Sequence, residues 1–150
     1  MEVPHKILSL IDRFKKIEHK EFQSSAVKTK YIEPFFQTLG WEIDNKRKSI
    51  APFKEVIILT KITANSPDFL FIANDKCKFY VSIPEEQIEL DNESNIVRKL
   101  QQFCWNANIP IGVVTNFKNL NIYDFRMKPG SKIKSILSLD YHQYDSNWRQ

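Results

Sequence analysis

One stretch, PDFLFIANDKCKFYVSIP at 67–84, restricts the fold more than any other part of the sequence. It contains two runs rich in aromatic and β-branched residues, DFLFIA and CKFYVSI, and residues 74–76 separate them. This spacing predicts a β-hairpin with a three-residue loop. Pro84 has no backbone N–H for a strand ladder, so the second strand is expected to end there. Asp68 would then lie at the open end of the hairpin.

A three-residue loop sets the pairing, with Leu70 opposite Tyr80 and Asp68 opposite Ser82. Hard divalent cations take oxygen ligands, so Asp68 is a candidate metal ligand and catalytic residue. The position across the ladder, where a second carboxylate would be expected, carries the Ser82 hydroxyl. A structural interpretation stays open, in which the Asp68 carboxylate accepts backbone hydrogen bonds at the strand entry. The sequence has no GxSxG, HExxH, glycine-rich phosphate loop or calcium loop.

Together with the hairpin, the apolar periodicity of the rest of the chain predicts the order helices, three strands, helix and two strands. Pro34 is expected to kink or split the second helix, and Gly40 to end it. The order of elements predicts an α/β domain, with a mixed β-sheet flanked by helices, over residues 1–150 with a leading helix within 1–20. The predicted elements are helices over 6–19, from Ser24 or Ser25 to Leu39, and over 92–108, and strands over 41–43, 53–63, 111–115 and 119–126.

Net charge is +4, from 22 basic and 18 acidic residues, which permits contact with nucleic acid without requiring it. The cluster Lys46, Arg47 and Lys48 is the candidate DNA-binding segment, and a solvated surface is the alternative. No apolar run approaches the length of a membrane span and no secretory signal is present, which predicts a cytoplasmic protein without membrane contact. Cys77 and Cys104 are expected to be buried, reduced thiols.

The large aromatic residues are predicted to fill the core rather than to stack on bases, because no basic groove accompanies them. They comprise Trp41, Trp105, Trp148, Phe35, Phe36 and Phe103, with Tyr80 and Tyr123 expected on the sheet faces.

Several segments together resemble the N-terminal nuclease domain of type I restriction enzyme R subunits, which also occurs in fused restriction-modification enzymes. They are YIEPFFQTLGWEID, FKEVIIL, PDFLFI, KFYV followed by PEE, LQQFCWNANIPIGVVTNFKNLNIYDFR and YDSNW, and they cover about residues 20–150. The resemblance implies a restriction-endonuclease-like PD-(D/E)xK fold that binds Mg²⁺ and hydrolyses DNA phosphodiester bonds. It also implies that the chain is the N-terminal part of a longer protein. Double-stranded DNA and other restriction-system subunits or domains would be its partners.

The chain departs from this family at the residues that carry the chemistry. Asp68 matches the family's aspartate, but Ser82 stands where the glutamate of Glu-x-Lys belongs, and the lysines are missing before Pro84. The family's acid early in the helix is replaced around Ser24 or Ser25. Its Gln-x-x-x-Tyr element is replaced at Lys99 and Phe103.

Three hypotheses follow. In the first, the domain keeps the nuclease fold, has lost cleavage, and contacts DNA or other restriction subunits. In the second, it is an active Mg²⁺-dependent endonuclease whose ligands have moved to Glu85 or Glu86 or, as weaker candidates, Glu21 or Glu55. In the third, it is a protein-interaction module without a DNA role. Mg²⁺ is expected only if a site survives, and otherwise no cofactor.

Overall fold

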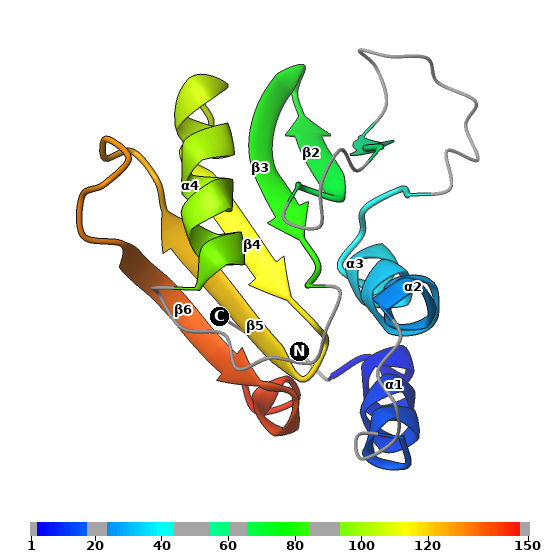
Figure 1. Ribbon diagram of the computed structural model, residues 1–150. Helices are drawn as coiled ribbons and strands as arrows, with labels where there is room; N and C mark the ends of the chain where they lie inside the picture. Colours follow the sequence, from blue (N-terminus) through cyan, green and yellow to red (C-terminus); the bar gives the residue numbers. More distant parts are fainter. Residues whose placement is uncertain (1–2, 18–23, 44–54, 61–65, 85–93, 148–150) are drawn as a thin grey trace.

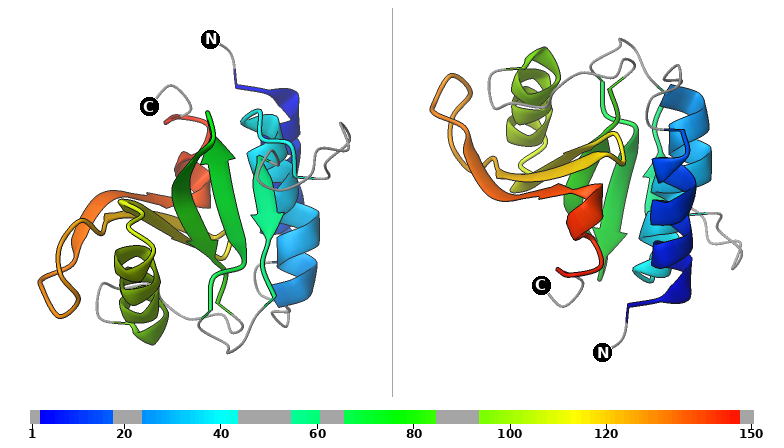
Figure 2. Two further views of the ribbon diagram at one scale, coloured as in Figure 1. Left: turned by 90° about the horizontal axis from the view of Figure 1, so that it is seen from above. Right: turned by 90° about the horizontal axis from the view of Figure 1, so that it is seen from below.

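The computed structural model describes residues 3–17, 24–43, 55–60, 66–84 and 94–147. They form a six-stranded sheet with helices on both faces (Figures 1 and 2). The helices are α1 (His5–Lys15), α2 (Ser24–Val27), the π-helical segment η1 (Lys28–Ile32), α3 (Glu33–Thr38), α4 (Asn95–Asn106) and the 3₁₀ turn η2 (Tyr141–Gln143). The strands are β1 (Val56–Ile58), β2 (Phe69–Ala73), β3 (Lys76–Ser82), β4 (Ile111–Thr115), β5 (Asn119–Asp124) and β6 (Lys134–Asp140).

The strands lie in sequence order, and the sheet is mixed. β3 and β4 are parallel, with α4 between them in the chain, and every other neighbouring pair is antiparallel. The predicted α/β class with a mixed, helix-flanked sheet is therefore confirmed. None of the described helices combines the length and apolarity needed to cross a membrane.

Alternate side chains of the central strands serve two separate hydrophobic clusters. Phe69 and Phe71 face the cluster formed with α1, α2, η1 and α3, whereas Leu70 packs against the cluster formed with α4. Val113 and Val114 likewise belong to opposite clusters. The apolar run IGVVT is thus covered on both faces, as its composition predicts. Figure 2 shows α4 on one side of the sheet and α1 to α3 on the other.

The helix that contains Pro34 is continuous but widened. The N–H of Glu33 bonds to the carbonyl of Lys28, five residues back, so the chain passes through a π-helical segment immediately before the proline. In a regular helix residue 34 would donate to the Lys30 carbonyl, and proline lacks that donor. The guanidinium of Arg13 on α1 donates to this carbonyl instead, at 3.3 Å. Gly40, at φ +102°, ends the helix as predicted.

The hairpin loop is shorter than predicted, yet the register at its open end is correct. Asn74 and Asp75, with φ of 53° and 60°, form a two-residue turn, and Ala73 pairs with Lys76. The register shifts at the next step, where Ile72 pairs with Cys77 and Phe71 pairs with Phe79. The extra residue between them is a β-bulge that restores the pairing of Leu70 with Tyr80.

Some predictions of local structure are wrong. Trp41–Ile43 is not a strand. Within the described part of the predicted 53–63 strand, residues 55–60, β1 covers only Val56–Ile58. β6 was not predicted, although Leu137 and Leu139 alternate with polar residues along it. This edge strand is largely exposed, so it lacks the dense apolar run of β4.

Two residues predicted to be buried are exposed. Trp105 is 44% exposed because it lies on the outer side of α4, and Cys77 is exposed because it follows the hairpin turn. Cys104 is buried as predicted, and burial raises the pKa of its thiol to about 12. Phe35 and Phe36 are core residues, Trp41 packs against the core, and Trp148 lies outside the described residues.

Replacing Gly112 by alanine is expected to destabilise the domain by about 1–3 kcal/mol through overpacking. A Cβ at this position would lie 2.5 Å from Phe125 Cε2 and 2.9 Å from Leu100 Cδ2, and both side chains are buried. Urea denaturation measures the loss. Adding Phe125→Leu should make the cost of Gly112→Ala smaller, because the clash is removed. A Gly112→Ala protein with wild-type stability would contradict this packing.

Candidate functional site

The candidate site lies at the open end of the β2–β3 hairpin, where Asp68 is 5% exposed. The Asp68 N–H donates to the Val81 carbonyl at 2.8 Å, and Asp68 Oδ2 accepts the Ile83 N–H at 2.7 Å. The ladder ends with the pair of Phe69 and Val81, so the predicted pair of Asp68 and Ser82 lies one step beyond it and stays a prediction. The Ile83 N–H is a backbone donor of the kind that the structural interpretation of Asp68 expects at the strand entry.

The second oxygen of the same carboxylate faces a lysine from the helical layer. Lys28 Nζ lies 4.0 Å from Asp68 Oδ1, and its side chain is 25% exposed. The same ammonium lies over the Phe69 ring, 4.9 Å from the ring centre. Lys28 is the first residue of η1, so the π-helical segment positions it. Both oxygens of Asp68 are therefore engaged by groups of the protein.

Ser82 is fully buried, with 0% exposure, and its Oγ has no hydrogen-bond partner in the described part of the chain. Strand alternation directs it to the side of the sheet that Tyr80 shares, the side of α4. A lone hydroxyl here supplies one weak neutral ligand and no negative charge. It does not take over the charge of the glutamate that the family resemblance places at this position.

Ser82→Ala is expected to leave stability unchanged or to raise it by up to about 1 kcal/mol, because it removes a buried hydroxyl that lacks a partner. Thermal and urea denaturation measure this difference, with Ser138→Ala as the control, since Ser138 Oγ donates to Asn121 Oδ1 at 2.7 Å. A clear loss of stability in Ser82→Ala would show that the hydroxyl has a role that this geometry does not provide.

The described residues do not fit a Mg²⁺ site. Within 3–17, 24–43, 55–60, 66–84 and 94–147, no group of three or more His, Cys, Asp and Glu side chains converges. Mg²⁺ is held by carboxylates, substrate phosphate and water, and here a single carboxylate is shared between an amide and an ammonium. The ammonium of Lys28 would also repel a second cation at Asp68 Oδ1.

Other predicted site residues are placed elsewhere or not described. Glu55 Oε2 accepts the Glu42 N–H at 2.8 Å, and its backbone bonds to Ile72, at the opposite end of β2 from Asp68. Glu55 therefore does not supply the missing ligand. The DNA-binding candidates Lys46, Arg47 and Lys48, and the alternative ligands Glu21, Glu85 and Glu86, lie outside the described residues.

In the described part of the chain, the positions where the resemblance implies further functional groups show no catalytic arrangement. Ser25 and Lys99 are exposed. Phe103 is half-buried, with its ring 6.5 Å from that of Tyr80 in an edge-to-face contact. Lys28 was not predicted as a site residue. One feature of the sequence points to Lys28. It follows, within one helical turn, the place around Ser24 or Ser25 where the resembled family carries an acid.

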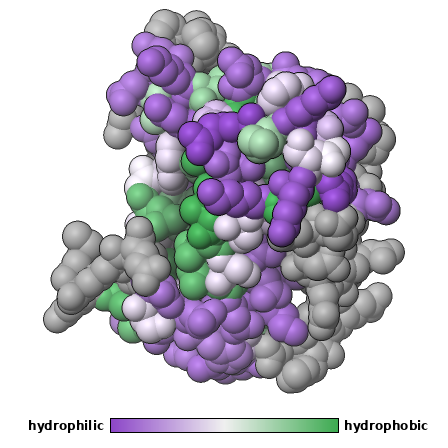
Figure 3. Space-filling view, turned by 90° about the vertical axis from the view of Figure 1, so that its left-hand side faces the viewer, coloured by the Kyte–Doolittle hydropathy of each residue, from purple (hydrophilic) through white to green (hydrophobic). Residues whose placement is uncertain are grey.

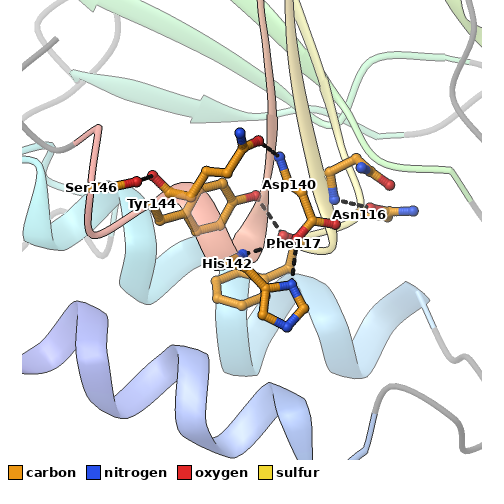
Figure 4. A network of polar contacts seen from close by, with 8 residues as sticks. Asn116, Phe117, Asp140, His142, Tyr144 and Ser146 are labelled. Atoms are coloured by element: carbon orange, nitrogen blue, oxygen red, sulfur yellow. Dashed lines mark hydrogen bonds and ion pairs between the residues drawn. The ribbon is translucent and has the colours of Figure 1, made fainter.

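The segments that carry the family resemblance meet in an aromatic cluster. Phe117 of TNF packs 5.2 Å from the ring of Tyr31 in YIEPFF and 5.5 Å from that of Tyr144 in YDSNW. The Tyr144 hydroxyl donates to the Phe117 carbonyl, and the Asn119 N–H donates to Asn116 Oδ1 at 2.8 Å (Figure 4). Burial raises the Tyr144 pKa, which keeps this donor protonated. These residues hold the helices, the β4–β5 loop and the C-terminal turn together, so their role is structural.

A separate feature is an apolar groove of about 370 Å³ on the sheet face opposite α4. Figure 3, viewed from the side of β6, shows hydrophobic residues gathered in a hollow among hydrophilic ones. Apart from Asn147, its lining is hydrophobic or aromatic: Phe35, Phe36, Leu39, Trp41, Phe79, Ile111, Val113, Leu120, Ile122, Leu137, Leu139 and Tyr144.

Comparison with known proteins gives one distant relative, the type II restriction enzyme and methyltransferase RM.Eco57I of Escherichia coli. The two sequences are 23% identical over 125 residues, which is 77% of this chain. The chain spans only 12% of the length of that relative. No protein-family model and no solved structure matches. The similarity is therefore to one part of a restriction-modification enzyme.

Proposed function

We propose that this chain is a nuclease-like domain of a restriction system that has lost DNA cleavage and is retained for contact with DNA or with other restriction domains. The observation that supports this proposal most strongly is the set of groups around the Asp68 carboxylate. This carboxylate accepts the Ile83 N–H and faces Lys28, and the neighbouring strand β3 ends in the uncharged Ser82. Similarity to a restriction-modification enzyme supplies the biological setting. The PD-(D/E)xK assignment belongs to the same proposal.

The loss of cleavage follows from the groups that phosphodiester hydrolysis requires. The reaction needs an activated water and positive charge on the phosphoryl oxygens, commonly from a divalent metal. Asp68 and the Ser82 hydroxyl supply too little negative charge to strip water from Mg²⁺. Removing one such stabilising group costs several kcal/mol of barrier, about 10²–10³ in rate. Loss of several of them leaves no useful activity.

A plasmid-nicking assay tests this function. The purified domain is incubated with supercoiled plasmid in Mg²⁺ and then in Mn²⁺, with Asp68→Ala as the matched control. Equal, background-level nicking by both proteins is expected. Nicking by the wild type that Asp68→Ala abolishes would overturn the proposal and favour the active endonuclease with relocated ligands.

DNA contact, as part of this proposal, is assigned to Lys46, Arg47 and Lys48. Phosphate contacts release counterions, so duplex binding should be measurable at low salt and weaken steeply as salt rises. The triple alanine variant should bind more weakly and with a shallower salt dependence, by roughly 0.9 in the logarithmic slope for each phosphate that it no longer neutralises. Fluorescence anisotropy with an arbitrary duplex measures both.

A second candidate function is docking without a DNA role, which the apolar groove favours. Its proposed occupant is an adjoining domain of the same restriction assembly, because the matched relative is a single polypeptide of which this chain spans 12%. The groove is lined by apolar side chains of α3, β4, β5 and β6. Absence of duplex binding at low salt would favour this candidate over DNA contact.

A further inference from the structure

We propose that the Lys28 ammonium is the built-in cation of the Asp68 site, taking the place that a divalent metal ion would occupy. The inference rests on the proposed non-cleaving function and deepens it. Lys28 would account for both the inactivity of the site and the stability of its buried carboxylate. The site would then be complete without metal, and Mg²⁺ would be excluded by a charge of the protein itself.

The geometry at the carboxylate supports this assignment. Asp68 Oδ2 is taken by the Ile83 N–H at 2.7 Å, so Oδ1 is the oxygen that points to a cation, and Lys28 Nζ lies 4.0 Å from it. A Mg²⁺ ion would need to approach Oδ1 to about 2.0–2.1 Å. It would then lie within a few ångströms of the ammonium. The two cations therefore compete for one place, and metal binding requires Lys28 to leave.

Lys28 is held in place by more than its carboxylate. Its Nζ lies over the face of Phe69, a fully buried ring, at 4.9 Å from the centre, which is a cation–π geometry. Its backbone carbonyl accepts the Glu33 N–H in the π-helical segment. These contacts direct the side chain of Lys28 toward the hairpin.

The surrounding charges also fit a resident ammonium. Burial raises the pKa of Glu33, and the charge of Lys28 lowers it by a smaller amount. Asp68 and Glu33 are thus both carboxylates within electrostatic reach of one ammonium. The Asp68 side chain is 7% exposed, so this is not an ordinary surface ion pair between two solvated groups. Without Lys28, the buried carboxylate would lose the ammonium that faces its Oδ1.

Three variants test the proposal without DNA. Lys28→Met keeps an apolar stem against Phe69 and removes the charge. Lys28→Glu places a second carboxylate beside Asp68. Lys30→Met is the matched control, since Lys30 lies in the same π-helical segment with an exposed side chain. Each protein is stripped with EDTA, titrated with Mn²⁺ by calorimetry, and melted with and without Mn²⁺.

Wild type and Lys30→Met should melt at the same temperature with Mn²⁺ and with EDTA. Lys28→Glu should bind Mn²⁺ at least about tenfold more tightly than wild type, the change that about 1.4 kcal/mol produces. Adding Asp68→Ala should abolish that gain. Lys28→Met should melt lower in EDTA than wild type and recover in part with Mn²⁺, so the test survives if Lys28→Glu does not fold.

The inference would be overturned if Lys28→Met were as stable as wild type in EDTA and its melting temperature did not change with Mn²⁺. Mn²⁺ binding by wild type as tight as by Lys28→Glu would also overturn it. The plasmid assay separates this failure from failure of the proposed function. If the plasmid stays intact and the Lys28 variants neither bind Mn²⁺ nor melt differently with it, only the proposed role of Lys28 is wrong. Nicking that depends on Asp68 rejects the proposed function itself.

Discussion

Phe117→Ala is expected to reduce the free energy of unfolding by about 4 kcal/mol, in the range measured for large aromatic truncations in cores. Phe117 is 2% exposed, and its ring lies 4.9 Å from that of Phe14 and 5.2 Å from that of Tyr31. Its carbonyl accepts the hydroxyl proton of Tyr144. Truncation therefore leaves a cavity where α1, η1 and the β4–β5 loop meet. Urea denaturation measures the loss.

Phe103→Ala is the matched control for that truncation, because Phe103 is half-buried on α4 and has one ring contact, with Tyr80. It should cost clearly less than Phe117→Ala. Phe117 also has φ +68°, which favours glycine over other residues, so the packing of the ring must offset the backbone cost. Equal losses of unfolding free energy in the two variants would contradict the importance of the aromatic cluster for stability.

Asp68→Ala is expected to cost about 2–3 kcal/mol, since a buried N–H left without its acceptor costs about 1–3 kcal/mol and Lys28 loses its partner as well. Lys28 is a quarter exposed and can turn to water, which limits the second contribution. Asp68→Asn should cost less, because its amide oxygen still accepts the Ile83 N–H. Thermal and urea denaturation compare the three proteins.

The opposite result for Asp68 would be informative. Active-site groups are often held at a cost to stability, so replacing them can stabilise an enzyme. A gain in stability in Asp68→Ala would mean that the carboxylate is strained for function. It would contradict the account in which the backbone of Ile83 and the charge of Lys28 satisfy it.

Local chemistry was sufficient to predict the main elements and the mixed sheet. The two strands around 74–76 and the stop at Gly40 follow from side-chain alternation and turn residues. The two-residue turn and the bulge were not predicted. A two-residue loop followed by a bulge gives the same register at the open end of the hairpin as a three-residue loop does. β6 was missed because an edge strand with exposed residues has a weak apolar signal.

The candidate site was only half predictable. Strand periodicity predicts Ser82 beside Asp68 at the open end of the hairpin, one step beyond the last ladder pair, Phe69 with Val81. Lys28 approaches from a helix far away in the sequence, and its place depends on how η1 packs on β2. No spacing rule connects the two. The same limit explains Trp105, whose exposure is set by which side of α4 faces the sheet.

A calorimetric titration of Mn²⁺ into the wild-type domain, with Asp68→Ala as control, decides whether Asp68 binds metal. The two titrations should be indistinguishable, because Lys28 already compensates the Asp68 carboxylate. Saturable Mn²⁺ binding by the wild type that is lost in Asp68→Ala would contradict this expectation. That result would mean that Asp68 belongs to a metal site with ligands outside the described residues.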